Sequence, residues 1–376
     1  MYFNYYYVVS KITYIFTNNR KNNFLNDTIQ AKEFYYGLPS IDSKLNNIKV
    51  IEFSNKTNLN TKFINLFDEF LRRFVSLPFY TSKLLNIENI RILKSTDHLI
   101  IVPESSALSA LSMLLFLKKK YNIKVSIFAM GLYSKKIRYP IFKNLHYLLI
   151  KILLIYSDHI FFLGKGELQK AKNIHKKFIH KFYYFPFSID TEFWKFINYE
   201  LPKKNEIIFV GNDGNRNFDL LIDIASELKD FKFIFVSKSP IVKEINLNNV
   251  KIISGEWGSN EVSDIDLKSI YQKARMCILP LKESSQPSGQ SVALQSMSLG
   301  IPVLISDTEG FWDKENFIHE HNILFCNNSI DDWVESIERY FNDLSLLSKV
   351  SKNGQDLVKN KFNLNIFNEK LQEFLD

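Results

Sequence analysis

The sequence predicts two α/β domains, each with a doubly wound parallel sheet, that face each other across a cleft. The length of 376 residues leaves room for two domains of about 150 residues or more. Short apolar runs alternate with helical patterns through both halves of the chain, as in βαβ units with right-handed crossovers. Ligands of such sheets bind beyond the carboxyl ends of the strands. We therefore expect the functional residues in the loops that face the cleft.

Short apolar runs bounded by turn residues are the predicted strands. In the first half they are residues 12–16, 48–53, 98–102, 124–129 and 159–163. In the second half they are residues 206–210, 231–236, 250–254, 276–280, 302–306 and 322–325. Helical periodicity between the strands is clearest over residues 63–74 and 107–120.

The boundary between the domains is predicted in residues 188–205. This stretch is rich in aromatic residues and then passes through Pro202, Lys203 and Lys204 before the next strand begins. The expected division is a first domain over residues 1–190, a second over 191–355, and a C-terminal helix over 356–376.

Composition narrows the class of protein and of partner. The chain is 46% hydrophobic and 23% charged, which excludes disordered, collagen-like and disulfide-scaffold proteins. Cys277 and Cys326 are the only cysteines, which fits a reducing cytoplasm. The net charge of +8 favours anionic partners such as nucleotide phosphates, membrane headgroups or nucleic acid, although an AT-rich genome explains the lysine excess equally well. No segment is predicted to span a membrane.

The most informative segment runs from residue 279 to residue 310. A predicted strand at 276–280 is followed by a helix for which Ser288 is the expected N-cap, and Gly300 ends that helix. Backbone N–H groups at the start of this helix would suit a diphosphate, because the helix dipole is positive there. An ordinary capped helix that packs on a sheet fits the local pattern as well.

In its surroundings this segment resembles the donor-binding half of the retaining family 4 glycosyltransferases, which have the GT-B fold of two facing Rossmann-like domains. The resemblance extends from Phe187 to the C-terminus. It rests on an ordered set of motifs: FSIDTEFW at 187–194, FVG at 209–211, NRNFDLLI at 215–222, NVKIISGEW at 249–257, LKSIYQKARMCILP at 267–280 and ALQSMSLGIPVLISDTEG at 293–310.

The resemblance implies transfer of a sugar from a nucleotide diphosphate sugar to a hydroxyl acceptor, with the anomeric configuration retained and no cofactor or metal. Synthesis of cell-surface polysaccharide or glycolipid is the expected setting, and the C-terminal helix is expected to pack back on the first domain. The implied donor-binding residues are Gly211, Asn212, Arg216, Lys238, Gly255, Glu256, Ser288, Gly289, Gln290, Ser291 and Gln295.

The chain departs from the family at the paired glutamates of the donor motif. Pro287 and Gln295 stand at or near those two positions. Gln295 can hydrogen-bond ribose hydroxyls but carries no charge, and Glu283 can replace the first carboxylate only if the loop holds an insertion. The catalytic candidates are therefore Arg216, Glu283 and Gln295, with Arg216 also open to interpretation as a solvated charge. A non-catalytic nucleotide-sugar-binding subunit is the alternative function, and no nucleic-acid-reading motif is found.

The first domain is expected to bind the acceptor in the loops at 104–106, 130–133 and 164–167, with Glu104 and Gly131 as candidates. Lysines and arginines gather at 118–120, 135–138 and 170–181, where they would attract an anionic membrane surface. An apolar helical stripe within residues 63–80 fits core packing better than a membrane interface. These features favour a cytoplasmic protein, peripheral on the inner face of the membrane, with a lipid-linked acceptor.

Overall fold

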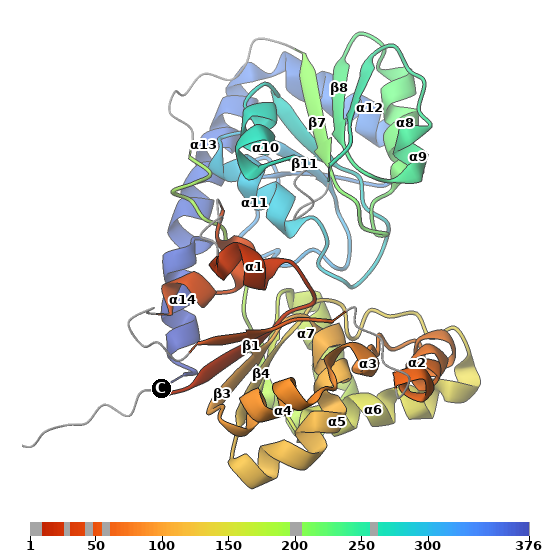
Figure 1. Cartoon of the computed structure of the whole chain (residues 1–376). Coiled ribbons are helices and arrows are strands. Elements are labelled where there is room, and N and C mark those ends of the chain that lie inside the picture. The colour runs from red at the N-terminus through yellow and green to blue at the C-terminus, as the bar shows by residue number, and fades with distance from the viewer. Residues whose placement is uncertain are drawn as a thin grey trace, which may run out of the picture.

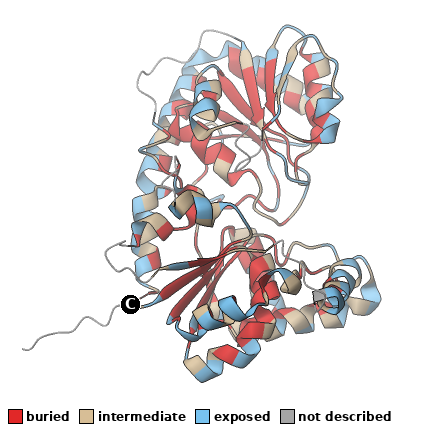
Figure 2. Ribbon diagram, viewed as in Figure 1, coloured by how far each residue is buried: buried red, intermediate tan, exposed pale blue. Residues whose placement is uncertain are grey.

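The computed structural model describes residues 10–25, 31–41, 48–54, 61–195, 205–255 and 262–375. They form two α/β domains stacked end to end, each around one six-stranded parallel sheet (Figure 1). Buried residues concentrate in the two sheets and in the helix faces that cover them (Figure 2). The fold class expected from the alternating apolar runs is confirmed.

The first sheet has the strand order β2-β1-β3-β4-β5-β6, and its strand pairs are parallel. Chain order reverses between β1 and β3, which makes that point the topological switch of the domain. The strands are β1 (Ile12–Ile15), β2 (Lys49–Ile51), β3 (His98–Ile101), β4 (Lys124–Ala129), β5 (His159–Phe162) and β6 (Phe182–Tyr184).

Helices cover both faces of this sheet (Figure 1). The α-helices are α1 (Arg20–Leu25), α2 (Thr61–Phe70), α3 (Thr81–Leu84), α4 (Ile87–Lys94), α5 (Glu104–Tyr121), α6 (Lys143–Ile155) and α7 (Lys165–Ile174). Short helical segments are η1 (Glu33–Tyr35), η2 (Leu38–Ser40), η5 (Pro140–Phe142), η6 (Lys176–Lys181) and the π-helical η4 (Leu71–Val75), which continues α2.

The second sheet has the order β12-β11-β10-β7-β8-β9, which is the Rossmann order read from β9 inward, with its switch point between β7 and β10. Its strands are β7 (Glu206–Val210), β8 (Lys232–Val236), β9 (Val250–Ile253), β10 (Met276–Leu279), β11 (Val303–Ser306) and β12 (Leu324–Cys326). The helices after β7 are α8 (Phe218–Glu227), α9 (Pro240–Lys243), α10 (Asp264–Tyr271), α11 (Gln290–Ser298), α12 (Ile330–Asn342), α13 (Leu344–Lys361) and α14 (Leu364–Gln372).

The end of the chain returns to the first domain. Phe367 of α14 stacks on Phe128 of β4 with ring centroids 5.9 Å apart and meets Phe185 edge-on at 4.8 Å. Ile189 and Asn363 form a parallel β-bridge beside this contact. The long helix α13 runs through residues 355 and 356, where the sequence placed a domain boundary, and the chain turns only at Phe362.

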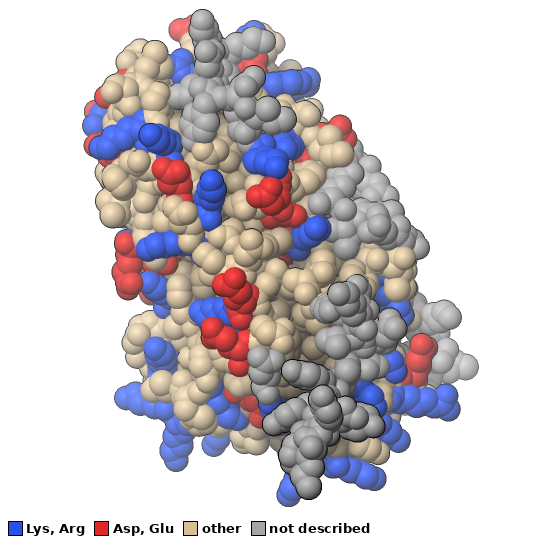
Figure 3. Space-filling view, turned by 90° about the vertical axis from the view of Figure 1, so that its left-hand side faces the viewer, with Lys and Arg blue, Asp and Glu red and all other residues tan. Residues whose placement is uncertain are grey.

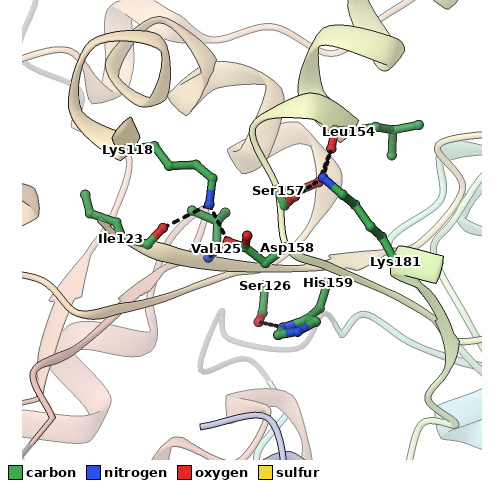
Figure 4. A network of polar contacts seen from close by, with 9 residues as sticks. All are labelled: Lys118, Ile123, Val125, Ser126, Leu154, Ser157, Asp158, His159 and Lys181. Carbon is green, nitrogen blue, oxygen red and sulfur yellow. Dashed lines mark hydrogen bonds and ion pairs between the residues drawn. The ribbon is translucent and has the colours of Figure 1, made fainter. Parts of the chain in front are cut away.

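A polar network connects elements at the N-terminal ends of strands β4 and β5 of the first sheet (Figure 4). Lys118 and the backbone N–H of Val125 both contact Asp158 Oδ2. Lys181 donates to the carbonyl oxygens of Leu154 and Ser157, at 2.8 and 2.7 Å, and so satisfies carbonyl groups at the end of α6. These two lysines of the predicted basic clusters therefore serve the fold.

Two details differ from the expectations. The edge strand β6 was not predicted, because three residues are too short a run to show a period. The apolar stripe at 63–80 was expected to pack in the core, yet Phe63, Leu66 and Phe67 are exposed while Leu71 is buried. Among the described residues no helix is long and apolar enough to cross a membrane.

Candidate functional site at the domain interface

The loops after the strands of both sheets meet at the interface between the domains. Gln290, the first residue of α11, donates from Nε2 to the carbonyl oxygen of Leu163 after β5, at 2.8 Å. A Cβ atom on Gly131 would lie 2.8 Å from the side chain of Gln286, so the backbone approaches the second domain closely there. The carboxyl edges of the two sheets therefore face each other in this structure.

Arg216 lies at the switch point of the second sheet. It follows β7 and forms an isolated β-bridge with Leu281, which follows β10. The residue is only 3% exposed, and a Cβ atom on Gly211 would clash with its Nε. Nη1 lies 3.2 Å from Asp213 Oδ2 in an ion pair, yet neither Nε nor Nη1 has a hydrogen-bond partner within the described part of the chain.

The start of α11 lies beside this guanidinium group. A Cβ atom on Gly289 would be 3.7 Å from Arg216 Nη1, so the backbone at the start of the helix lies close to the guanidinium group. Gly289 is the N-cap with φ of +82°, a left-handed conformation that favours glycine. Ser288 was expected to cap the helix, and that expectation is wrong: its Oγ instead accepts from Asn215 Nδ2 at 2.8 Å.

Asn212 joins the ends of three neighbouring strands. Its Oδ1 accepts from the backbone N–H of Lys238 after β8 at 2.6 Å, and its Nδ2 donates to the carbonyl oxygen of Gly255 after β9 at 2.9 Å. The backbone of Lys238 therefore lies at this edge, with a half-buried side chain. Glu256, which was predicted to contact the donor, lies outside the described residues.

Gln295 lies in a contact between the domains. Its Nε2 donates to Glu33 Oε1 at 2.9 Å, and the indole N–H of Trp194 donates to the same oxygen at 2.7 Å. Burial raises the pKa of Glu33 to about 7, against the opposing effect of these hydrogen bonds. Sequence analysis missed Glu33, because no motif marks it and its partners lie far away along the chain.

Two comparisons with known proteins found matches that agree with this fold. Residues 204–343 match the family model of group 1 glycosyl transferases. Most of the second domain is therefore similar to group 1 glycosyl transferases, and the chain has the GT-B fold. No curated protein matches the chain by sequence.

Solved structures share the GT-B fold over nearly the whole chain. HepE from Anabaena, solved with UDP and glucose, is 12% identical with a TM-score of 0.68, covering 97% of this chain and 99% of that one. Sucrose-phosphate synthase from Thermosynechococcus elongatus is 15% identical with a TM-score of 0.69, covering 97% and 98%. The lipopolysaccharide outer core galactosyltransferase WaaB is 17% identical with a TM-score of 0.58, covering 97% and 98%.

Glu283 occupies the loop after β10 of the second domain. It is exposed, and its Oε1 accepts from the backbone N–H of Glu309 at 2.8 Å. It thus links the loops that follow β10 and β11. Its assignment as a replacement for the family's first glutamate stays a prediction, as does that of Ser291, which is half-buried in the first turn of α11.

On the first domain of the GT-B fold, two carboxylates hold the loop after β4. Glu104 Oε2 accepts from the N–H of Met130 at 2.9 Å, and Glu167 Oε1 accepts from those of Gly131 and Tyr133 at 3.1 and 2.9 Å. Burial, reinforced by Glu104, raises the pKa of Glu167 to about 8. Glu104 and Gly131, both predicted for the acceptor side, therefore meet at one edge of the sheet.

Ion pairs add to the contact between the GT-B domains. Lys165 Nζ lies 2.7 Å from both Asp313 Oδ1 and Glu315 Oε2, and the Lys165 backbone N–H donates to the carbonyl oxygen of Trp312 at 3.0 Å. Tyr184 also donates to Asp313, at 3.1 Å. Within the described ranges no group of His, Cys, Asp and Glu side chains is arranged to hold a metal ion.

Proposed function

We propose that this protein transfers a sugar from a nucleotide diphosphate sugar to a hydroxyl acceptor. The observation that carries the proposal is Arg216, which is buried and leaves Nε and Nη1 without a hydrogen-bond partner in the described chain. Leaving buried donors unpaired costs free energy unless a ligand pairs with them. The diphosphate of a donor sugar satisfies this requirement, since it offers anionic oxygens beside the start of α11.

The neighbours support the nucleotide part of this proposal. Solved structures of HepE contain UDP, UDP-glucose, or UDP with glucose. UDP is therefore the first nucleotide to test here. WaaB, a lipopolysaccharide galactosyltransferase by its name, shares the fold, which is compatible with a role in cell-surface polysaccharide or glycolipid synthesis.

In the proposed reaction the C–O bond between the sugar and the diphosphate breaks, a bond from the sugar to the acceptor oxygen forms, and the acceptor's hydroxyl proton passes to the leaving diphosphate or to water. Negative charge grows on the leaving diphosphate, where Arg216 and the first N–H groups of α11 would stabilise it. This stabilisation is electrostatic and needs no covalent intermediate with the protein. We further propose that the anomeric configuration is retained and that no metal is required. NMR of the product tests the first point, and transfer in the presence of EDTA tests the second.

Calorimetric titration with UDP tests the proposed donor site. Arg216→Gln should weaken UDP binding at least about tenfold, because a charge-assisted hydrogen-bonding group is lost. Arg275→Gln is the matched control. Arg275 is a second buried arginine of the same domain, but it precedes β10 at the opposite edge of the sheet and donates to the carbonyl oxygen of Phe341. Equal UDP affinity in the wild type and Arg216→Gln would refute the site.

A non-catalytic nucleotide-sugar-binding subunit is the second candidate function. It is favoured by Gln295, which stands where the family has a glutamate and is hydrogen-bonded to Glu33. Release of UDP from UDP-glucose in the presence of acceptor extracts separates the two functions. Binding at Arg216 without turnover for any donor and acceptor pair would favour the subunit.

A further inference from the structure

We propose that the flank of the first domain formed by α2, η4 and η5 docks on an anionic lipid bilayer. Helix α2 lies at the flank of the first domain, on the right in Figure 1. Three large apolar side chains project outward from it beside Lys62 and Glu69: Phe63, Leu66 and Phe67 are 82%, 63% and 61% exposed. A helix in contact with water normally shows the opposite arrangement, with its polar face outward.

Two polar side chains of α2, Asn65 and Asp68, contact the body of the protein. Asp68 is buried, and its Oδ2 accepts from the backbone N–H and the hydroxyl of Ser82 at 3.0 and 3.2 Å. Asn65 also accepts from the Ser82 hydroxyl. These hydrogen bonds fix the rotation of the helix, so its apolar side chains are held outward rather than left there by loose packing.

The apolar face continues onto a neighbouring segment. Phe70 meets Phe142 of η5 edge-on with ring centroids 5.7 Å apart, and Phe74 packs against Tyr139 at 5.4 Å. These contacts bring Ile141, which is 85% exposed, to the same side of the domain. Two elements from distant parts of the chain thus present one apolar surface, which is what insertion into the headgroup region requires.

A basic pocket of about 400 Å³ adjoins this surface. Its charged lining residues are all cationic: Arg72, Arg73, Lys135, Lys136 and Arg138. The same continuous segment, from α2 into η4, contributes residues to both the apolar face and the pocket. An apolar surface next to cations matches an anionic bilayer, which offers acyl chains below a layer of phosphates.

The opposite flank of the molecule differs in the charge of its side chains. The face in Figure 3, seen from the left of Figure 1, carries acidic side chains among the basic ones. An apolar face beside a purely cationic pocket therefore distinguishes the α2 flank from that side of the molecule. Charge complementarity selects an anionic membrane as its occupant.

The pocket also connects to the acceptor edge of the first sheet. Lys135 lies 3.6 Å from Glu104, whose other oxygen holds the loop after β4. An acceptor anchored in the bilayer would thus arrive close to this edge. That step rests on the proposed function, whereas docking itself does not.

Co-sedimentation with vesicles, without any sugar donor, tests the inference. The wild type should bind vesicles of equal parts phosphatidylglycerol and phosphatidylcholine, and binding should weaken with added salt or with phosphatidylcholine alone. Phe63→Ser/Phe67→Ser and Arg73→Gln/Arg138→Gln should each lower partitioning at least about tenfold. These four side chains are exposed, so the variants should keep their melting temperatures.

Matched changes on the second domain serve as controls. Ile241→Ser/Ile318→Ser removes two exposed apolar side chains, and Lys232→Gln/Lys251→Gln removes two exposed charges. Neither pair should alter vesicle binding. Absence of wild-type binding, equal losses in test and control pairs, or binding of inorganic phosphate without vesicle binding would each overturn the proposal. UDP titration of the same samples reports separately on the donor site.

Discussion

The side-chain amide of Gln295 donates a 2.9 Å hydrogen bond to the carboxyl group of Glu33, across the interface between the two domains. Both side chains are buried. A glutamate at position 295, as the family motif has, would set a second carboxylate against Glu33, and like charges in a buried site repel. The amide therefore suits its partner in the first domain.

Exchanging the two side chains tests this relationship. Gln295→Glu should destabilise the fold by about 2 kcal/mol or more at neutral pH, since a donor is replaced by a second acid. Glu33→Gln/Gln295→Glu should recover much of that loss by restoring one amide and one carboxyl group. Urea unfolding of the wild type, both single variants and the double variant gives the coupling free energy. Additive effects would show that the two residues do not interact.

Two buried acids should make stability fall as the pH rises from about 4.5 to about 8, most visibly between about 7 and 8. The folded protein keeps protons on Glu33 up to a pKa of about 7 and on Glu167 up to about 8, whereas both are released near 4.5 in the unfolded chain. Within this window the folded state binds more protons than the unfolded state, so added base favours unfolding. Three histidines oppose the effect below about pH 7, because burial lowers the pKa values of His146, His159 and His175 and the unfolded chain binds more of their protons there.

Melting curves across this pH range provide the measurement. Glu33→Gln/Glu167→Gln should flatten the dependence. Glu338→Gln, an exposed change on α12, should leave its slope unaltered. An unchanged slope in the double variant would assign the pH dependence to other groups.

Gly211→Ala should reduce UDP binding about as much as Arg216→Gln does. The added methyl group would occupy the space of the Arg216 side chain and displace its guanidinium group. Gly214→Ala is the matched control in the same loop, since a Cβ atom there meets no atom within 4 Å. Calorimetric titration of the two variants compares them directly. Similar affinities for both alanine variants would argue against a role for the position of Arg216.

Asp313→Ala should destabilise the protein by about 1–3 kcal/mol, because Lys165, Tyr184 and Asn316 all lose an acceptor at a buried site. Glu315→Ala removes the other acidic partner of Lys165, which is exposed, and should cost less than about 1 kcal/mol. Urea unfolding measures both losses. Equal losses would show that burial does not strengthen the Asp313 contacts.

The predicted strands and the loops that follow them were read correctly from the sequence, because apolar periodicity and turn residues are local signals. The parallel topology then brought the loops after β7 and β10 together, as expected for a switch point, and this placed Arg216 beside Gly289. The N-cap was misplaced by one residue, since serine is as common an N-cap as glycine and the sequence does not show that Gly289 has a φ of +82°.

Only the tertiary structure decided which side chains meet across the domains and which way α2 faces. Glu33 and Gln295 are 262 residues apart, and their contact depends on how two complete sheets are stacked. The stripe on α2 has the period of a core helix, but its rotation is set by hydrogen bonds that Ser82 donates to Asn65 and Asp68. A sequence pattern identifies an apolar face, whereas the neighbouring elements determine whether that face is covered.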